Sequence, residues 1–177
     1  SFLTSNPSPI IQEDGSIVMI FKGRRYINGY QHSAMSLGIA YAPQIEGPYK
    51  VLNNNEPIFE VNGQGEAEDP FLWKDSNGYH IIFKDHVAKF TGEQGGGVMA
   101  HSKDGIQWTV DKAPKAYSRS VEWEDGKIEM QGQLERPFIL FEDGKPIYIF
   151  FATMDGPGGF ENASRSWNMV IPIKDKE

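Results

Sequence analysis

Polar or charged residues stand directly before three prolines of the sequence. Residues 68–70 read Glu-Asp-Pro, residues 135–137 read Glu-Arg-Pro, and Asn6 precedes Pro7. Two carboxylates held together can act on a glycosidic bond, one as a general acid and the other as a base or as a modulator of its partner's pKa. The spacing around Glu68, Asp69 and Glu135 therefore raises the question of which elements position them.

Each proline opens a predicted β-hairpin. The segment after it ends in an Asp-Gly or Asn-Gly turn, which favours the positive φ angles of tight hairpins. A run of β-branched and aromatic residues follows, at residues 17–21, 79–83 and 147–151, and reads as a buried strand. A further predicted strand comes after a long loop, at residues 37–41, 97–101 and 167–171. No stretch of a dozen residues has helical periodicity, so the predicted class is all-β.

The hairpins recur at a nearly constant interval. The prolines at positions 7, 70 and 137 are separated by 63 and 67 positions, so three to four strands repeat along the chain. Four-stranded repeats are typical of β-propeller blades. We expect one propeller region over residues 1–177, with blades at about 1–62, 63–132 and 133–177. Because propellers close with about four to eight blades, we expect the missing blades to come from a longer chain or from a partner.

The residues before the prolines are expected to meet. Inner strands of a propeller converge on its axis, and a proline is tolerated as the first residue of a strand. We therefore expect a central pocket formed by Asn6, Glu68, Asp69, Glu135 and Arg136. Buried polar groups cost free energy unless they are paired. Either Arg136 pairs with Asp69 or Glu135 and locks the blades together, or the carboxylates are catalytic.

The openings at residues 68–73 and 135–139 resemble those of the five-bladed β-propeller glycoside hydrolases of family 43 and their relatives. That family typically places an Asp base, an Asp pKa modulator and a Glu general acid at the starts of successive inner strands. The resemblance implies that Asp69 is the modulator and Glu135 the general acid, with Glu68 as a substitute. Asn6 stands where the resemblance implies an acid, and an amide cannot act as a base, so either the base lies in a missing blade or the chemistry differs.

The loops that follow the hairpins supply further candidates. Loops of about a dozen residues exceed ordinary hairpin lengths and suggest function. We expect Arg24, His32, Lys84 and His86 to donate hydrogen bonds to sugar hydroxyls, and His86 is alternatively a general acid or a metal ligand. Residues 46–48 read Glu-Gly-Pro, as the general-acid motif of the family does, but they lie in an outer hairpin turn and are expected to be structural.

Composition excludes several classes of partner. The net charge is −7 with scattered basic residues, so no nucleic-acid partner is expected. No apolar run approaches the roughly 20 residues of a membrane span, so no membrane partner is expected either. The absence of cysteine excludes disulfides and thiolate catalysis. No cofactor is required, although carboxylates at a propeller axis can hold calcium. The compartment stays open, with a secreted or periplasmic location favoured.

Three functions remain as alternatives. The first is a glycoside hydrolase, or a portion of one, that cleaves a plant-type or microbial oligo- or polysaccharide. The second is a non-catalytic carbohydrate-binding propeller that uses the same axis. The third is a structural repeat domain in which the axial charges form ion pairs only. The amide at Asn6 and the missing blades separate the first two, because a hydrolase needs a base.

Overall fold

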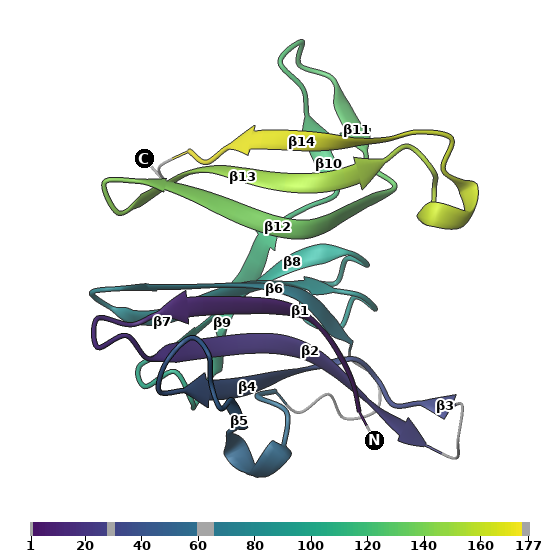
Figure 1. Ribbon diagram of the computed structural model, residues 1–177. Coiled ribbons are helices and arrows are strands. Elements are labelled where there is room, and N and C mark those ends of the chain that lie inside the picture. Colours follow the sequence, from purple (N-terminus) through teal and green to yellow (C-terminus); the bar gives the residue numbers. More distant parts are fainter. Residues whose placement is uncertain (1, 28–30, 60–65, 175–177) are drawn as a thin grey trace. The chain divides into compact units, whose positions relative to one another are not determined.

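The computed structural model describes residues 2–27, 31–59 and 66–174 (Figure 1). Within them the chain is built from antiparallel strands and two single turns of 3-10 helix, Asn53–Asn55 and Phe160–Asn162. It divides into two compact units, Ser1–Ala116 and Tyr117–Glu177. No helix in the described part of the chain is long and apolar enough to cross a membrane.

The first unit contains two sheets. The first sheet has the order β1-β2-β4-β5, with β3 pairing to β2, and the second has the order β6-β7-β8-β9. Their strands are β1 (Phe2–Ile11), β2 (Ile17–Ile27), β3 (Gln31–His32), β4 (Ser36–Ala42), β5 (Lys50–Val51), β6 (Ala67–Asp75), β7 (Gly78–Asp85), β8 (Gly96–Ser102) and β9 (Thr109–Tyr117). The sequence predicted six strands, and all of them lie within observed strands of the two units: residues 17–21, 37–41, 79–83, 97–101, 147–151 and 167–171.

The second unit contains a three-stranded sheet and a small hairpin. The sheet has the order β12-β13-β14, and β10 pairs with β11. The strands are β10 (Ser120–Glu122), β11 (Ile128–Met130), β12 (Gln133–Glu142), β13 (Lys145–Met154) and β14 (Ser166–Pro172). The sequence did not predict β10 and β11. Both strands are only three residues long and mostly exposed, and such strands lack the run of apolar residues that signals a buried strand.

One predicted loop is wrong. The segment after residue 21 was expected to be loop, but β2 continues to Ile27, and Leu3 pairs with Arg24 across the ladder. Strand pairing with β1 therefore extends β2 beyond its apolar residues. Lys22 and Arg24 stand on a strand, and Lys84 likewise lies within β7.

The sequence suggested that each of the three prolines begins a strand, and this prediction is wrong. Each lies inside a strand at a β-bulge, where the register shifts between Ser5 and Ser8, between Glu68 and Phe71, and between Glu135 and Phe138. A bulge leaves extra residues unpaired, so it tolerates proline.

The residue before each proline has a left-handed backbone conformation. The φ angles of Asn6, Asp69 and Arg136 are 51°, 52° and 52°. Asn and Asp tolerate this conformation better than other residues with a side chain, for which it costs about 1–2 kcal/mol. The three openings therefore share one backbone geometry, and Arg136 is the residue least suited to it.

The core of the first unit lies between its two sheets. Val18, Ile20 and Ile39 of the first sheet belong to one buried cluster with Ile81 and Phe83 of the second. The two sheets are thereby held as neighbours. Because β1 and β6 belong to these sheets, the same packing fixes the bulges of β1 and β6 beside one another.

Candidate functional site

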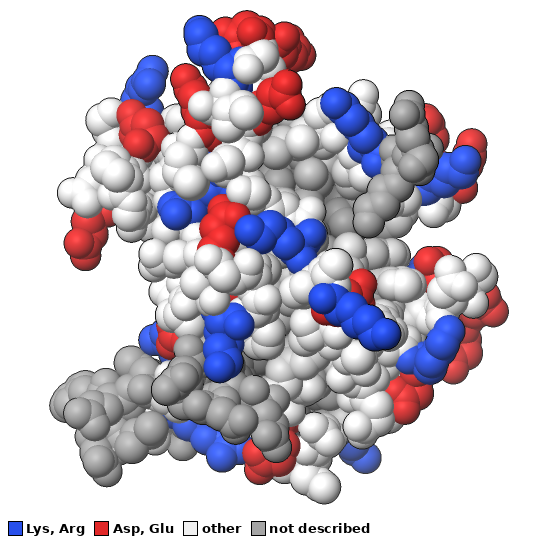
Figure 2. Space-filling model, turned by 180° about the vertical axis from the view of Figure 1, so that it is seen from behind, with Lys and Arg blue, Asp and Glu red and all other residues white. Residues whose placement is uncertain are grey.

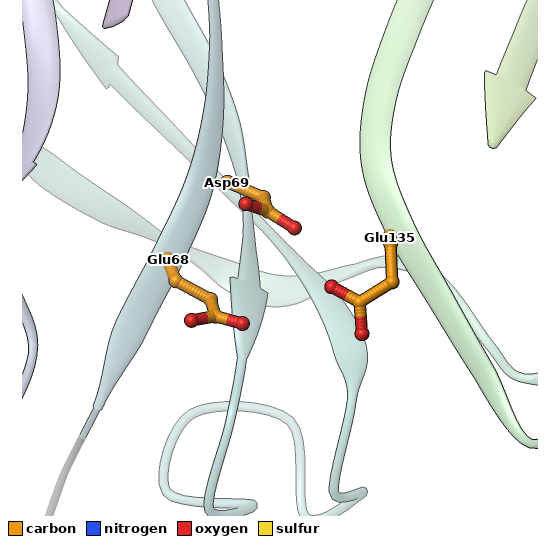
Figure 3. Close-up of side chains that lie close together, drawn as sticks. All are labelled: Glu68, Asp69 and Glu135. Atoms are coloured by element: carbon orange, nitrogen blue, oxygen red, sulfur yellow. The ribbon is translucent and has the colours of Figure 1, made fainter. Parts of the chain in front are cut away.

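Two carboxylates stand at the bulge of β6. Glu68 and Asp69 are both buried, and Figure 3 shows their carboxyl groups on the same side of the strand. Successive residues of a regular strand point to opposite faces. The left-handed conformation of Asp69 breaks that alternation, and a bulge re-aims side chains in this way.

Cations surround Glu68. Lys84 lies opposite it across the ladder, and the Nζ atom of Lys84 is 3.4 Å from Glu68 Oε1. Lys22 Nζ is 3.3 Å from Oε2, and His86 Nδ1 is 3.8 Å from Oε1. Only 2% of Lys84 is exposed, so its charge is held in place by the fold. A carboxylate partner stabilises the charge of a buried lysine, and removing it would leave that charge uncompensated.

These cations decide the charge of Glu68. Burial by itself raises the pKa of Glu68, but the attraction of Lys84, Lys22 and His86 outweighs burial, and the pKa lies below its usual value. Glu68 is therefore ionised at neutral pH. A general acid has to carry a proton at the working pH, so this environment disfavours that role for Glu68.

A second carboxylate continues the charged network in the first unit. Glu66 Oε1 accepts hydrogen bonds from Arg24 Nη2 at 3.0 Å and from the Met35 backbone N–H at 3.2 Å. His86 Nε2 is 3.7 Å from Glu66 Oε2, so His86 lies between Glu66 and Glu68. Basic and acidic side chains thus alternate along the series Arg24, Glu66, His86, Glu68 and Lys84. Such a network can hold polar groups in fixed positions.

Asp69 has an amide partner. Asn6 Nδ2 donates a hydrogen bond to Asp69 Oδ1. The two residues occupy corresponding bulge positions of β1 and β6, so the interaction joins neighbouring sheets. A hydrogen bond from a neutral donor orients a carboxylate without adding a positive charge. Asn6, which stands where the family resemblance implies an acid, therefore donates a hydrogen bond to the neighbouring Asp69.

Glu135 has a different setting in the second unit. It is buried on β12, where Figure 3 draws it, and precedes the exposed Arg136. Across the ladder it faces Ala152, whereas Glu68 at the corresponding bulge position faces Lys84. The sheet that holds Glu135 therefore places no lysine opposite it.

The other residues singled out in the sequence lie in three different places. Arg24, Lys84 and His86 belong to the network around Glu66 and Glu68. His32 lies on β3, where its backbone pairs with Tyr26, and its side chain is outside the described part of the structure. The predicted turn at Glu46 is an exposed connection between β4 and β5.

Sequence reasoning missed two members of the network, Lys22 and Glu66. A signal for Lys22 was present, because Lys22 and Lys84 both follow the Phe that ends an apolar strand. In the structure Lys22 pairs with Ser5, as Lys84 pairs with Glu68. Glu66 had no such signal, since its partners Arg24 and Met35 lie 42 and 31 positions away.

Aspartates shape two of the loops that were expected to carry function. Asp85 accepts hydrogen bonds from the backbone N–H groups of Lys89, Phe90 and Thr91, at 2.7–2.9 Å. Asp155 accepts from Ser164 and Arg165, and these hydrogen bonds hold its pKa well below the usual value. Both loops thus have internal support that fixes their conformation.

A cavity of about 130 Å³ lies elsewhere in the first unit. Phe21, Leu37 and Val51 supply apolar walls, and Arg24 and Arg25 supply charge. Neither Glu68 nor Asp69 lines it. The cavity is therefore separate from the carboxylates.

The surface charges are intermixed. Figure 2 shows Lys and Arg interspersed with Asp and Glu over the face that it draws, without an extended area of one sign. A protein that binds nucleic acid through its phosphates presents a concentrated basic area. The face drawn in Figure 2 does not have that character.

No family model and no curated protein matches the sequence. Solved structures do match. One described as a glycoside hydrolase aligns with a TM-score of 0.66 at 15% identity, over 98% of this chain and 46% of its own. A GH32 β-fructofuranosidase from Bombyx mori gives 0.59 at 14% identity, over 94% and 33%. An arabinanase from Bacillus subtilis gives 0.52 at 14% identity, over 94% and 50%.

The fold is that of β-propeller glycoside hydrolases. The predicted all-β propeller class is thereby confirmed, and the sheets of both units are propeller blades. The chain spans half or less of the length of each of these three proteins. At 14–15% identity the likeness concerns the fold, and catalysis has to be argued from the residues themselves.

Proposed function

We propose that this chain is part of a glycoside hydrolase that cleaves an oligo- or polysaccharide, with Glu135 as the general acid and Asp69 as its partner carboxylate. The observation that carries the proposal is the recurrence of buried carboxylates at one bulge geometry in two blades. Burying a carboxylate costs free energy, so its recurrence at the same position of two blades calls for an explanation. The fold of the chain adds support, since solved glycoside hydrolases share it.

The choice of Glu135 over Glu68 follows from their neighbours. Glu68 is ionised because of Lys84 and Lys22, so it has no proton to donate. Glu135 stands two residues before Pro137, the position that the family resemblance implies for the general acid. We assign Glu68 an electrostatic role, in which it fixes Lys84 and His86 rather than exchanging protons with substrate.

Asp69 is suited to the role of the second carboxylate. Asn6 donates a hydrogen bond to Asp69 and so orients its carboxylate. In the proposed reaction the acid proton passes from Glu135 to the glycosidic oxygen as the bond from that oxygen to the anomeric carbon breaks. A water then attacks the anomeric carbon and yields its proton to a base. Asn6 cannot be that base, so we expect it in a further blade.

A non-catalytic carbohydrate-binding propeller is the second candidate. The amide at Asn6 favours it, because the position where the family resemblance implies an acid has no group that accepts a proton. Glu68 favours it as well, because its lowered pKa leaves it ionised and without a proton to donate. Binding alone needs hydrogen-bond donors and acceptors, which the network from Arg24 to Lys84 can supply.

Hydrolysis assays on the product of the complete gene separate the two. The wild type and the variants Glu135→Gln and Glu142→Gln are incubated with a panel of oligosaccharides, and reducing ends and binding affinity are both measured. Glu142 is the matched control, since it is exposed at the end of the same strand. We expect Glu135→Gln to lose about 10²–10⁴-fold in kcat with affinity retained, and Glu142→Gln to resemble the wild type.

Two outcomes would contradict the hydrolase. If Glu135→Gln is as active as Glu142→Gln, Glu135 is not the acid. If the wild type binds a sugar and releases no reducing ends, the carbohydrate-binding alternative holds.

Calcium at these carboxylates stays a prediction. Calcium takes six to eight oxygen ligands, and Asp69 and Glu68 offer carboxylate oxygens. Those of Glu68 already face Lys84 and Lys22, which opposes a cation there. The proposed chemistry uses no metal, so we expect EDTA to leave hydrolysis intact. Calcium binding, where present, would raise the thermal midpoint over that in EDTA.

A further inference from the structure

The cavity of about 130 Å³ in the first unit lies on one face of the first sheet. Phe21, Gly23 and Arg25 alternate along β2 with residues of the other face, and all three line the cavity. Gly23 pairs with Thr4 on one side and with Ser36 on the other, and both of these residues line the cavity too. An apolar cavity of about 150 Å³ holds one benzene molecule, so the space is close to that of a single six-membered ring.

Gly38 gives the aromatic ring of Phe21 its place in the cavity wall. The two residues pair across β2 and β4, and a Cβ atom built on Gly38 would lie 2.5 Å from Phe21 Cζ. Any side chain at position 38 would therefore displace the ring. The glycine lets the ring cross its backbone at close range, and the partly exposed ring forms an apolar wall of the cavity.

Gly23 differs from Gly38, because the space over it is open. Among the described residues, a Cβ atom built on Gly23 would meet only Phe21 Cε2, at the ordinary contact distance of 3.8 Å. Gly23 does not have a left-handed backbone, and it pairs in regular register with Thr4 and Ser36. Glycine weakens the interior of a strand, and there it often marks a position that a ligand approaches closely. The open space over Gly23 therefore favours a bound molecule.

The segment 52–58 borders the cavity on its other side. The first and the last N–H group of this segment donate hydrogen bonds to carbonyl oxygens of β4, both at 2.9 Å. Between these two anchors Asn53, Asn54 and Asn55 have φ angles of 54°, 54° and 64°, and residues 55–57 line the cavity. Left-handed backbone at three consecutive residues with side chains carries strain, and such strain is concentrated at ligand sites and switches. The fold thus holds a strained segment against the open side of the sheet.

The charges at the cavity are paired within the protein. Arg25 Nη2 donates a hydrogen bond to the Asn55 carbonyl oxygen at 3.1 Å and lies 3.6 Å from Glu56 Oε1. Arg24 Nη2 lies 3.0 Å from Glu66 Oε1. An anionic ligand would have to compete with these carboxylates for the two arginines. A neutral ligand with hydroxyl groups can instead accept from Arg25 and donate to Glu56 without separating them.

We propose that this cavity is a carbohydrate-binding site separate from the carboxylates of β6, and that its ligand is one neutral sugar ring. The C–H groups on one side of a sugar ring are apolar and pack against an aromatic ring such as that of Phe21. The hydroxyl groups of the sugar meet Arg25 and Glu56. Binding pockets commonly combine apolar walls with a few polar groups in this way. Glu68 does not line the cavity, so binding there is independent of the hydrolysis proposed above.

Titration calorimetry with the methyl glycosides of xylose, arabinose, glucose and galactose tests the proposal, on the 177-residue chain and on the product of the complete gene. We expect at least one of the four to bind both polypeptides. Gly23→Val should lower that affinity at least tenfold, because the valine side chain fills the cavity. Its thermal midpoint should stay the same or rise, since valine suits a strand better than glycine does. Ser120→Val puts the same side chain at an exposed strand position of the second unit and should leave the affinity unchanged.

Two further variants locate the bound sugar, and they decide the matter if Gly23→Val is unstable. Arg25→Met removes a donor to the sugar hydroxyls and should lower the affinity about tenfold. Lys127→Met, at a mostly exposed residue of the second unit, should not. Glu135→Gln should bind the sugar as tightly as the wild type. This result is expected whether or not any substrate is hydrolysed, so failure of the proposed function leaves the test intact.

Several results would overturn the second sugar site. One is a wild type that binds none of the four glycosides, and another is a folded Gly23→Val protein that binds them as tightly as the wild type. Loss of binding in Glu135→Gln would place the sugar at the carboxylates instead. Cyclohexanol that competes as well as the sugar would show that the cavity takes any apolar ring. Binding to the 177-residue chain but not to the complete product would show that the cavity is covered there, and this too would contradict the proposal.

Discussion

Glu68 and Glu135 occupy the same position of two blades and differ in what stands across the ladder. Both precede the left-handed residue of a β-bulge, and both are buried. Glu68 faces Lys84, with Lys22 close by, whereas Glu135 faces Ala152. The backbone determines where a carboxylate stands in such blades. The neighbouring strand determines which side chain stands opposite that carboxylate, a lysine for Glu68 and an alanine for Glu135.

The largest effect is expected from removing the lysine in the blade of Glu68. Lys84→Met leaves a buried carboxylate with one lysine instead of two, and breaking a buried ion pair costs about 3–5 kcal/mol in free energy of unfolding. Chemical denaturation measures the loss. The control Lys127→Met removes a mostly exposed lysine and should change stability by less than about 0.5 kcal/mol. A Lys84→Met protein as stable as this control would show that the pair contributes nothing.

Making the blade of Glu135 resemble that of Glu68 should impair catalysis. Ala152→Lys places a cation across the ladder from Glu135 and favours its ionised form. We expect the basic limb of the pH–rate profile to move about one pH unit lower, with an approximately tenfold loss of kcat above it. The control Ala152→Met changes size without charge and should keep the wild-type profile. An unshifted limb in Ala152→Lys would argue against Glu135 as the acid.

The charge of Glu68 should appear in the pH dependence of stability. Its pKa is lower in the folded than in the unfolded state, so it contributes stability above its unfolded pKa, about 4.3. That contribution is lost as the pH falls toward the folded pKa, with a slope of up to about 1.4 kcal/mol per pH unit. Denaturation of wild type and Glu68→Gln from pH 3 to 6 measures the difference. Parallel curves would contradict the pairing with lysine.

The smallest effect concerns the bulge of the third blade. Arg136 has a φ angle of 52°, which glycine adopts without strain. Arg136→Gly should therefore stabilise the protein by up to about 1 kcal/mol, as measured by its thermal midpoint. The same change at Asp69 also removes the acceptor of the Asn6 amide and should not stabilise. A loss of stability in Arg136→Gly would indicate that the arginine side chain contributes more than its backbone strain costs.

The sequence predicted the strands of the three hairpins and the third strand after each, because apolar runs and turn residues are local signals. It did not predict the bulge, since a register shift depends on the partner strand. Nor did it predict the charge of Glu68, whose lysines lie 16 and 46 positions away in the chain. The hydrogen bond between Asn6 and Asp69 spans 63 positions. Such contacts exist only once the sheets have packed.

The most direct test of the assigned roles is the leaving-group dependence of hydrolysis by Glu135→Gln and Glu68→Gln. A substrate whose leaving group is already acidic needs no proton from the enzyme. We predict that Glu135→Gln loses about 10²–10⁴-fold in kcat on a poor leaving group and far less on a dinitrophenyl glycoside, while Glu68→Gln affects both alike. The reverse pattern, with leaving-group dependence in Glu68→Gln and none in Glu135→Gln, would contradict the central claim.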